Sequence, residues 1–263
     1  MTELVLRPGC SAPPGLTIEA RAARLRARSL MIATPVARNP VWQYTASFGA
    51  TIMALMEREI PVAFEFVVGN SNVARARNEL VAKFLASPAT DLLFADDDME
   101  WRPEAILNLL ASDKPLIGAV GRMRCDGPNS DPAVWCCRWF PSPDGALEQD
   151  ATGAVKVPGF GAALMLVNRA VFDAMIAAHP EWKRPGAPDW PEEIRAHYYE
   201  FFRFNHDAEA KEMGEDYVFC DRWRALGGDA FIRPDVVLGH VGSFTFRGAV
   251  EEILTPITSE DAA

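Results

Sequence analysis

The chain is predicted to fold as an α/β protein with a mostly parallel central sheet. Apolar runs of strand length alternate with amphipathic helical segments over Leu30–Leu110, which is the pattern of parallel strands connected by helices. One run, Leu92–Ala95, ends in three consecutive acids at positions 96–98, and open α/β proteins bind ligands at the carboxyl edge of such strands. With 263 residues and 49% hydrophobic side chains, the chain can bury the core of one large domain.

The first elements follow from local patterns. Leu30–Val36 and Val62–Val68 are largely apolar runs of strand length. Between them, Asn39 is a favourable N-cap for a helix that runs to about Glu59, with apolar residues at helical spacing. A Gly-Asn-Ser-Asn turn then precedes a helix over Val73–Leu85.

The later elements continue this alternation. Pro103–Leu110 is a helix with proline at its start, and Leu116–Val120 is another strand. Near the end of the chain, Glu215–Leu226 is a helix that two glycines terminate. A strand over Ala230–Leu238 then leads to His240.

Two segments break the rhythm. Gly127–Gly145 is rich in Pro, Asp, Trp and Cys and indicates irregular or antiparallel structure. His179–His206 contains several prolines and the aromatic cluster Tyr198–Phe204, which either packs in the core or forms an acceptor-binding insert. We expect an N-terminal arm over residues 1–28, one domain over 29–250 and a C-terminal tail over 251–263.

Composition limits the partners. The formal charge of −10 makes bulk binding of nucleic acid unfavourable, and the basic segment Arg21–Arg28 is explained by an exposed helix face or a loose arm. The five cysteines include no Cys-x-x-Cys pair, and the adjacent Cys136 and Cys137 would bridge only with strain, so reduced thiols are expected. With neither a signal peptide nor a membrane span in the sequence, the predicted location is the cytoplasm.

Three places in the sequence contain candidate functional residues. Adjacent carboxylates at 96–98 repel one another unless a cation or hydrogen-bond donors compensate them, which favours a divalent metal; the alternative is a solvated turn that caps the helix at Pro103. Glu215 and Asp216 are either catalytic or simply favourable first-turn acids. His240 is either structural or a ligand that shares Mn²⁺ or Mg²⁺ with the acids and substrate phosphates.

Three passages in this order, Ser71–Asn78, Leu92–Asp98 and Gly214–Trp223, together resemble motifs of glycosyltransferases with the GT-A fold, especially family 2. The resemblance implies a Rossmann-type three-layer sandwich with a mostly parallel central sheet and a smaller antiparallel element. It also implies a metal-dependent transfer of a sugar from a nucleoside-diphosphate sugar, with UDP-sugars favoured, to an acceptor hydroxyl.

The resemblance assigns roles residue by residue. The metal ligands that it implies are Asp96, Asp98 and His240, and the implied catalytic pair is Asp216 as general base with Glu215 beside it. The donor-binding residues that it implies are Thr34, Pro35, Arg77, Asn78, Asp96, Asp97, Gly159 and Gly161. Asp97 is included because three consecutive acids permit two registers of the Asp-x-Asp motif, whereas Arg77 could instead be a surface cation and the glycines could serve a turn alone.

Two other functions are compatible with the same residues. A nucleotidyltransferase that acts on a sugar phosphate would also use metal-binding acids, although no Gly-rich, basic stretch follows the first strand. A non-catalytic nucleotide- or glycan-binding protein could share the fold. The sequence favours the transferase. The resemblance implies inversion at the anomeric carbon, with a base on one face of that carbon and the metal on the other, whereas retention would leave Asp216 without the role of base.

Overall fold

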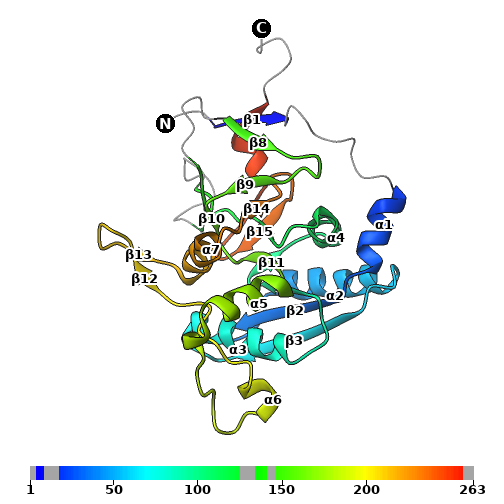
Figure 1. The fold of residues 1–263 in the computed structure, drawn as a ribbon. Helices are drawn as coiled ribbons and strands as arrows, with labels where there is room; N and C mark the ends of the chain where they lie inside the picture. Colours follow the sequence, from blue (N-terminus) through cyan, green and yellow to red (C-terminus); the bar gives the residue numbers. More distant parts are fainter. Residues whose placement is uncertain (1–3, 9–17, 125–133, 141–145, 257–263) are drawn as a thin grey trace.

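The computed structural model describes residues 4–8, 18–124, 134–140 and 146–256 and contains one large sheet with helices around it (Figure 1). Ten described strands form this sheet in the order β17-β1-β8-β9-β14-β6-β11-β4-β2-β3. In that order, their bounds are Leu254–Pro256, Leu4–Pro8, Ala146–Gln149, Val155–Val157, Ala230–Ile232, Leu116–Ala119, Leu164–Asn168, Asp91–Ala95, Leu30–Val36 and Val62–Val68. The central seven strands, from β9 to β3, are mostly parallel, because only β9 and β11 oppose the other five.

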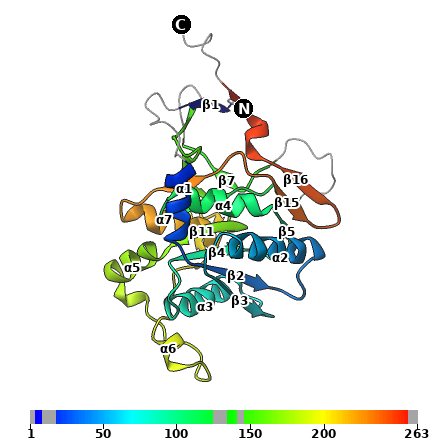
Figure 2. The same ribbon diagram turned by 90° about the vertical axis from the view of Figure 1, so that its right-hand side faces the viewer.

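Helices cover both faces of this sheet, and Figure 2 shows α2 and α3 on opposite sides of β2. The helices are α1 (Ile18–Arg26), α2 (Trp42–Met56), α3 (Val73–Leu85), α4 (Pro103–Ser112), α5 (Arg169–Ala178), α6 (Glu192–Arg195), α7 (Glu215–Ala225) and the short 3₁₀ helices η1 (Pro180–Trp182) and η2 (Val250–Ile253). One core layer joins α3, α5 and α7 to the sheet, and a second joins α1, α2 and α4 to its other face. The mixed α/β class is therefore confirmed, and the layering is compatible with the predicted three-layer sandwich.

Strand β4 shows why the chain folds in this way. All five of its residues are buried. Leu92 and Phe94 belong to the core layer with α3, whereas Leu93 and Ala95 belong to the layer with α2 and α4, because successive side chains of a strand point to opposite faces. A strand that is apolar on both faces must lie inside the sheet, and β4 accordingly lies between β11 and β2.

Three small sheets accompany the large one. Strand β5 (Met99–Glu100) pairs with β15 (Leu238–Val241), which pairs with β16 (Thr245–Gly248); β7 (Cys137–Arg138) pairs with β10 (Gly159–Phe160); and β12 (Asn205–His206) pairs with β13 (Glu212–Met213). All of these pairings are antiparallel. The residues before position 29 and after position 250 also contribute strands β1 and β17, which pair with each other at one end of the large sheet.

The predicted continuous strand Ala230–Leu238 is wrong. Strand β14 ends at Ile232, and a turn at Pro234 and Asp235 precedes β15. Proline has no N–H for a ladder hydrogen bond, and Arg233 ion-pairs with Asp235 across the turn (2.6 Å). The chain consequently leaves the large sheet and enters the small one that carries His240.

The predicted helix Asn39–Glu59 is shorter than expected. It begins at Trp42 after Val41, which forms no side-chain cap, and ends at Met56. The N–H group of Val41 donates to the carbonyl oxygen of Asp97 (3.0 Å). This tertiary hydrogen bond holds the preceding residues against the acidic loop, so Asn39 does not serve as the cap.

The basic segment near α1 is partly used in packing. Arg28 ion-pairs with the buried Asp91 (3.2 Å) and with Asp113 (3.1 Å). Among the described cysteines, Cys136, Cys137 and Cys220 are free thiols, whereas Cys10 and Cys125 lie outside the described residues. Within the described ranges, every helix is too short or too polar to cross a membrane.

Gly118→Ala in β6 is expected to destabilise the fold. A Cβ atom at this position would lie 2.2 Å from a ring carbon of Phe160 and 2.5 Å from the carbonyl oxygen of Leu164. Overpacking of this kind costs about 1–3 kcal/mol, which denaturant unfolding would measure. The control is Gly49→Ala in α2, where a Cβ atom meets nothing within 4 Å and helix propensity predicts a gain of about 1 kcal/mol or less. Equal stability of the two variants would contradict the prediction.

Candidate functional site

The three acids form a tight turn directly after β4. The N–H group of Asp96 donates to the carbonyl oxygen of Ala163 (3.1 Å), and the N–H group of Met99 donates to the carbonyl oxygen of Asp96 (3.2 Å). The turn leads at once into β5, so the acids lie between the large sheet and the small one. The carboxylates of Asp96, Asp97 and Asp98 are all partly buried there.

Arg77 links this acidic turn to the start of α7. Its Nη2 donates to both oxygens of Asp96 (2.9 and 3.2 Å), and its Nε donates to Glu215 (3.0 Å). Only 3% of Arg77 is exposed. Its remaining nitrogen, Nη1, has no hydrogen-bond partner among the described residues. The guanidinium is thus a buried link between the two carboxylates, with one buried N–H group that has no partner among the described residues.

The charges of this cluster depend on one another. Burial opposes the charged form of Arg77, but the carboxylates of Asp96 and Glu215 more than offset it and raise the pKa of Arg77. Burial, aided by the Asp98 carboxylate, raises the pKa of Asp96 to about 6, although Arg77 favours the ionised form. Two carboxylates from distant parts of the chain are therefore held together by one cation.

Arg77→Met is expected to destabilise the protein by about 3 kcal/mol, because removing one partner of a buried ion pair leaves uncompensated charge. The value is at the lower end of the usual range because the Asp96 side chain retains 28% exposure. Denaturant unfolding measures the loss. Adding Glu215→Gln should recover part of it, since one fewer buried carboxylate then lacks a partner. A double variant no more stable than the single one would contradict this explanation.

His240 lies beside Asp98. Strand pairing of β15 with β5 places His240 opposite Met99, and its Nε2 lies 3.4 Å from Oδ2 of Asp98. Its Nδ1 lies 2.8 Å from the carbonyl oxygen of Arg122. When the Nδ1–H group of the neutral ring donates a hydrogen bond to that carbonyl, Nε2 presents a lone pair toward Asp98. A cation between Nε2 and the carboxylate would then be bound by both, as in histidines that bind metals.

The pair Asp98 and His240 fits a divalent metal in part. Among the described residues, no group of three or more His, Cys, Asp or Glu side chains is arranged to hold an ion, so this pair would supply two ligands. Mg²⁺-type sites commonly have one or two protein ligands and complete their shell with water and substrate phosphates. Although burial acts in the opposite direction, His240 and Arg124 lower the pKa of Asp98, and despite its own burial His240 has a raised pKa because of Asp98.

Asp97 serves the neighbouring loop. Its Oδ2 accepts a hydrogen bond from the N–H group of Ala37 (3.1 Å), and its carbonyl oxygen accepts from Val41 (3.0 Å). Burial raises the pKa of Asp97, with the bond from Ala37 opposing the change. The carboxylate of Asp97 therefore ties the acidic turn to the loop after β2, and the donor contact implied for it stays a prediction.

Thr34 and Pro35 lie at the end of β2. The Thr34 side chain is fully buried and its hydroxyl lies 2.5 Å from that of Tyr44, so this side chain packs in the core. Pro35 pairs with Val67 of β3 and is partly buried. A ligand at this strand end would therefore contact Pro35 and the loop that follows β2, and not the Thr34 hydroxyl.

Asp216 is the second residue of α7 and lies next to Gly161, which directly follows β10. Its Oδ2 accepts from the N–H group of Ala162 (3.2 Å), and its Oδ1 accepts from that of Tyr217 (2.8 Å). Burial, together with the Glu215 carboxylate, raises the pKa of Asp216, although Arg77 acts in the opposite sense. A partly buried carboxylate with a raised pKa is a suitable proton acceptor near neutral pH.

The two predicted glycines let β10 and the residue after it approach α7. A Cβ atom on Gly161 would lie 3.1 Å from Cβ of Cys136 and 3.5 Å from Oδ2 of Asp216. A Cβ atom on Gly159 would lie 3.2 Å from Cβ of Cys220. Both positions therefore favour glycine for close packing, which is the structural alternative to donor binding.

Asn78 has a different environment from Arg77. Its side-chain amide donates to the carbonyl oxygen of Phe202 and accepts from the N–H group of Phe202, both at 2.8 Å. Asn78 is 4% exposed. These bonds fix the segment before α7 to α3, and the donor-binding role of Asn78 stays a prediction.

Sequence reasoning missed two residues of this site. Arg124 ion-pairs with Asp98 (3.0 Å). Because Arg124 follows strand β6 in the sequence, it could have been placed at the carboxyl edge of the sheet, where the acids lie. Cys136 lies beside Gly161, and burial raises the pKa of its thiol to about 11, helped by Asp216 and Asp96. No local sequence pattern indicates that Cys136 belongs to the site.

No protein-family model matches the chain, and no curated protein sequence matches it.

Proposed function

We propose that the chain is a metal-dependent glycosyltransferase of the GT-A type that transfers a sugar from a nucleoside-diphosphate sugar, with UDP-sugars favoured, to an acceptor hydroxyl. The observation that carries the proposal is the Arg77 bridge between Asp96 and Glu215. It brings the Asp-x-Asp strand end and the Glu-Asp helix start into one cluster. A solvated turn and an independent helix start would have no reason to share a buried cation.

The proposal divides the site into two sides. On one side, Asp98 and His240 would hold Mn²⁺ or Mg²⁺, with Asp96 available to the metal or the nucleotide. When bound, such an ion neutralises the charge that develops on a leaving diphosphate. Arg124, whose side chain is 51% exposed, can release Asp98 at little cost, because exposed ion pairs contribute little.

On the other side, Asp216 would accept the proton of the attacking hydroxyl. The bonds from Ala162 and Tyr217 orient its carboxylate, and its position at a helix N-terminus favours the ionised form. Arg77 keeps the two sides in register, since it contacts the residue before Asp216 as well as Asp96. If the acceptor hydroxyl attacks the anomeric carbon from the Asp216 side and the nucleoside diphosphate leaves on the metal side, the configuration at that carbon is inverted.

Ligand screening tests this proposal. Nucleoside diphosphates and their sugars are added with and without Mn²⁺, and thermal unfolding is followed, because a ligand that binds only the folded state raises its stability by mass action. A shift that needs both the nucleotide and Mn²⁺ is expected, with UDP compounds giving the largest.

Product identity then separates the alternatives. Release of nucleoside diphosphate supports the transferase, whereas release of pyrophosphate from a nucleoside triphosphate and a sugar phosphate would instead favour nucleotidyl transfer. Binding without turnover across a panel of acceptors would favour a non-catalytic binding protein.

A further inference from the structure

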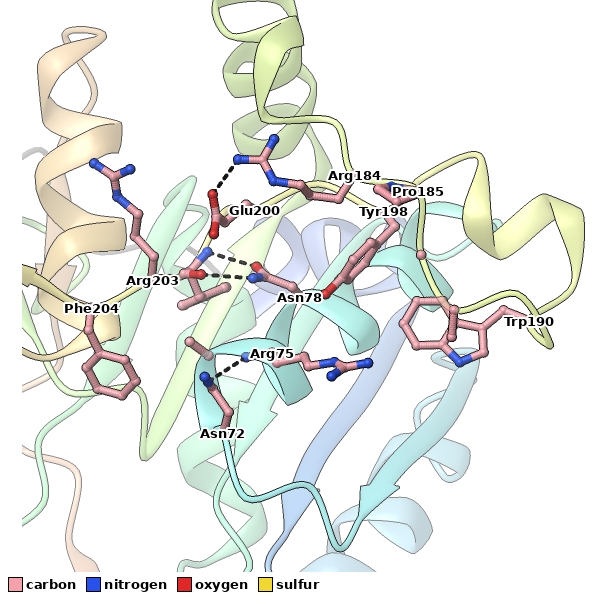
Figure 3. A pocket seen from close by; sticks show the side chains of 14 residues that line it. Asn72, Arg75, Asn78, Arg184, Pro185, Trp190, Tyr198, Glu200, Arg203 and Phe204 are labelled. Atoms are coloured by element: carbon pink, nitrogen blue, oxygen red, sulfur yellow. Dashed lines mark hydrogen bonds and ion pairs between the residues drawn. The ribbon is translucent and has the colours of Figure 1, made fainter.

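A cavity of about 500 Å³ lies between the first half of α3 and the segment that leads to α7. Figure 3 shows the two walls, with Arg75 and Asn78 on α3 facing Tyr198, Glu200 and the loop that carries Trp190. Helix α3 follows β3, so its first turns lie at the carboxyl edge of the sheet, as the acids do. Asn78 lines this cavity, and the preceding residue is the buried arginine of the acidic cluster.

The walls of the cavity are fixed by buried and partly buried polar contacts. Asn78 forms two hydrogen bonds with the backbone of Phe202. From α7, Arg222 donates to the carbonyl oxygens of Glu200 (2.5 Å) and Phe201 (2.8 Å). The cavity is therefore preformed, which reduces the ordering cost of binding.

The cavity has an excess of positive charge. Arg75 is exposed, and its guanidinium forms no hydrogen bond or ion pair with any described side chain; Figure 3 shows it extending below Tyr198 toward Trp190. Arg203 also lines the cavity and is exposed and unpaired within the described residues, but Figure 3 shows its guanidinium extending beside α7, away from Arg75. Arg184 is already matched by Glu200 (2.6 Å). Arg75, which has no ion-pair partner among the described residues, therefore gives an anion a local attraction in a chain of net charge −10.

Aromatic rings lie next to this charge. Trp190 and Tyr198 make an edge-to-face contact with ring centroids 5.1 Å apart, and both line the cavity. Burial raises the pKa of Tyr198, and the nearby Arg75 cation partly offsets this rise. Such rings supply an apolar surface with a polar edge, against which the C–H face of a sugar ring can pack.

We propose that this cavity binds an anionic saccharide, with its carboxylate or phosphate on Arg75 and its ring against Trp190 and Tyr198. This inference rests on the proposed function where it assigns the saccharide as the acceptor. Asp216 does not line the cavity, so an acceptor bound here would extend from it to the start of α7, where Asp216 lies. The acidic group selects the acceptor, and the aromatic pair orients it.

Binding of small probes tests the site without any transfer reaction. Glucose 6-phosphate and glucuronic acid are expected to bind about tenfold more tightly than glucose, because one charge-assisted hydrogen bond contributes about that much. Calorimetry or ligand-observed NMR measures the affinities. Arg75→Gln should remove this difference. The matched control is Arg58→Gln, which makes the same charge change just after the end of α2. Equal binding of glucose and glucose 6-phosphate, or a difference that survives Arg75→Gln, overturns the inference.

Two further arms test the ring surface. Trp190→Ala should weaken glucose 6-phosphate binding and Trp190→Phe should restore most of it, whereas inorganic phosphate alone should bind more weakly than glucose 6-phosphate. Phosphate that binds as tightly as the sugar phosphate would overturn the saccharide assignment.

The acceptor role has its own readout. With donor and Mn²⁺ present, glucose 6-phosphate should accelerate nucleoside diphosphate release more than glucose does, and equal acceleration would overturn that role. If the anionic sugars bind through Arg75 but no nucleotide-sugar binds with Mn²⁺, the proposed function fails and the binding site stands. If the donor binds and turns over but the anionic sugars show no preference, this inference alone fails.

Discussion

Asp98→Asn is expected to lower Mn²⁺-supported turnover of the nucleotide-sugar by about 10³-fold or more, since a bound metal contributes several kcal/mol of transition-state stabilisation. The amide keeps the size of the side chain but loses the charge that faces His240 at 3.4 Å. The fold should persist, because the carbonyl oxygen of Asp98 still accepts from the N–H group of Val241.

Two measurements check this result. Turnover is followed against Mn²⁺ concentration, and the Mn²⁺-dependent thermal shift should disappear together with activity. Asp173→Asn on α5, an exposed acid far from the site in sequence, serves as the control and should keep both. An Asp98→Asn protein with normal Mn²⁺-dependent turnover would remove Asp98 from the metal site.

Asp216→Asn is expected to reduce kcat by about 10²–10⁴-fold, the usual contribution of general base catalysis. Donor and Mn²⁺ binding should be retained, because among the described residues the carboxylate hydrogen-bonds only with the N–H groups of Ala162 and Tyr217. Steady-state kinetics with a fixed donor measure kcat, and thermal shifts with donor and Mn²⁺ measure binding. Loss of donor binding in parallel with kcat would show that Asp216 is structural.

The pH profile gives a second test of Asp216. Its pKa is raised, chiefly by burial, and only the ionised carboxylate accepts a proton. Activity should therefore be complete at pH above this raised pKa and fall as the pH decreases through it, at a higher pH than an ordinary aspartate would give. In Asp216→Asn this acidic limb should be absent from the remaining activity. A limb that persists unchanged would belong to another group.

The sequence predicted the central strands well for a physical reason. A strand buried on both faces is mostly apolar, so β2 and β4 could be recognised from composition, and the acids at 96–98 had to follow at the carboxyl edge. Helix α3 could likewise be recognised from the helical spacing of its apolar residues. These features depend on residues that are close in the chain.

Long-range contacts could not be predicted in this way. Arg77 and Glu215 are 138 residues apart, and neither periodicity nor a cap indicates that they meet. The resemblance placed Asn78 at the nucleotide, which stays a prediction, but its two hydrogen bonds with the backbone of Phe202 could not be read from the sequence. The break at Pro234 was visible as a proline in a strand, but its outcome, a second sheet that pairs β15 with β5, depends on tertiary pairing.

The division between two sheets has a consequence for local stability. His240 belongs to β15, the middle strand of a three-stranded sheet, which pairs with β5 over two residue pairs and with β16 over four. Strand β4 pairs with β11 over five residue pairs and with β2 over four, inside the ten-stranded sheet. Elements with few backbone hydrogen bonds open at lower free energy than core strands. Amide protons of β15 should therefore exchange with solvent through local opening, without global unfolding. His240 would then separate from Asp98 transiently while Arg77 stays bound to Asp96 and Glu215.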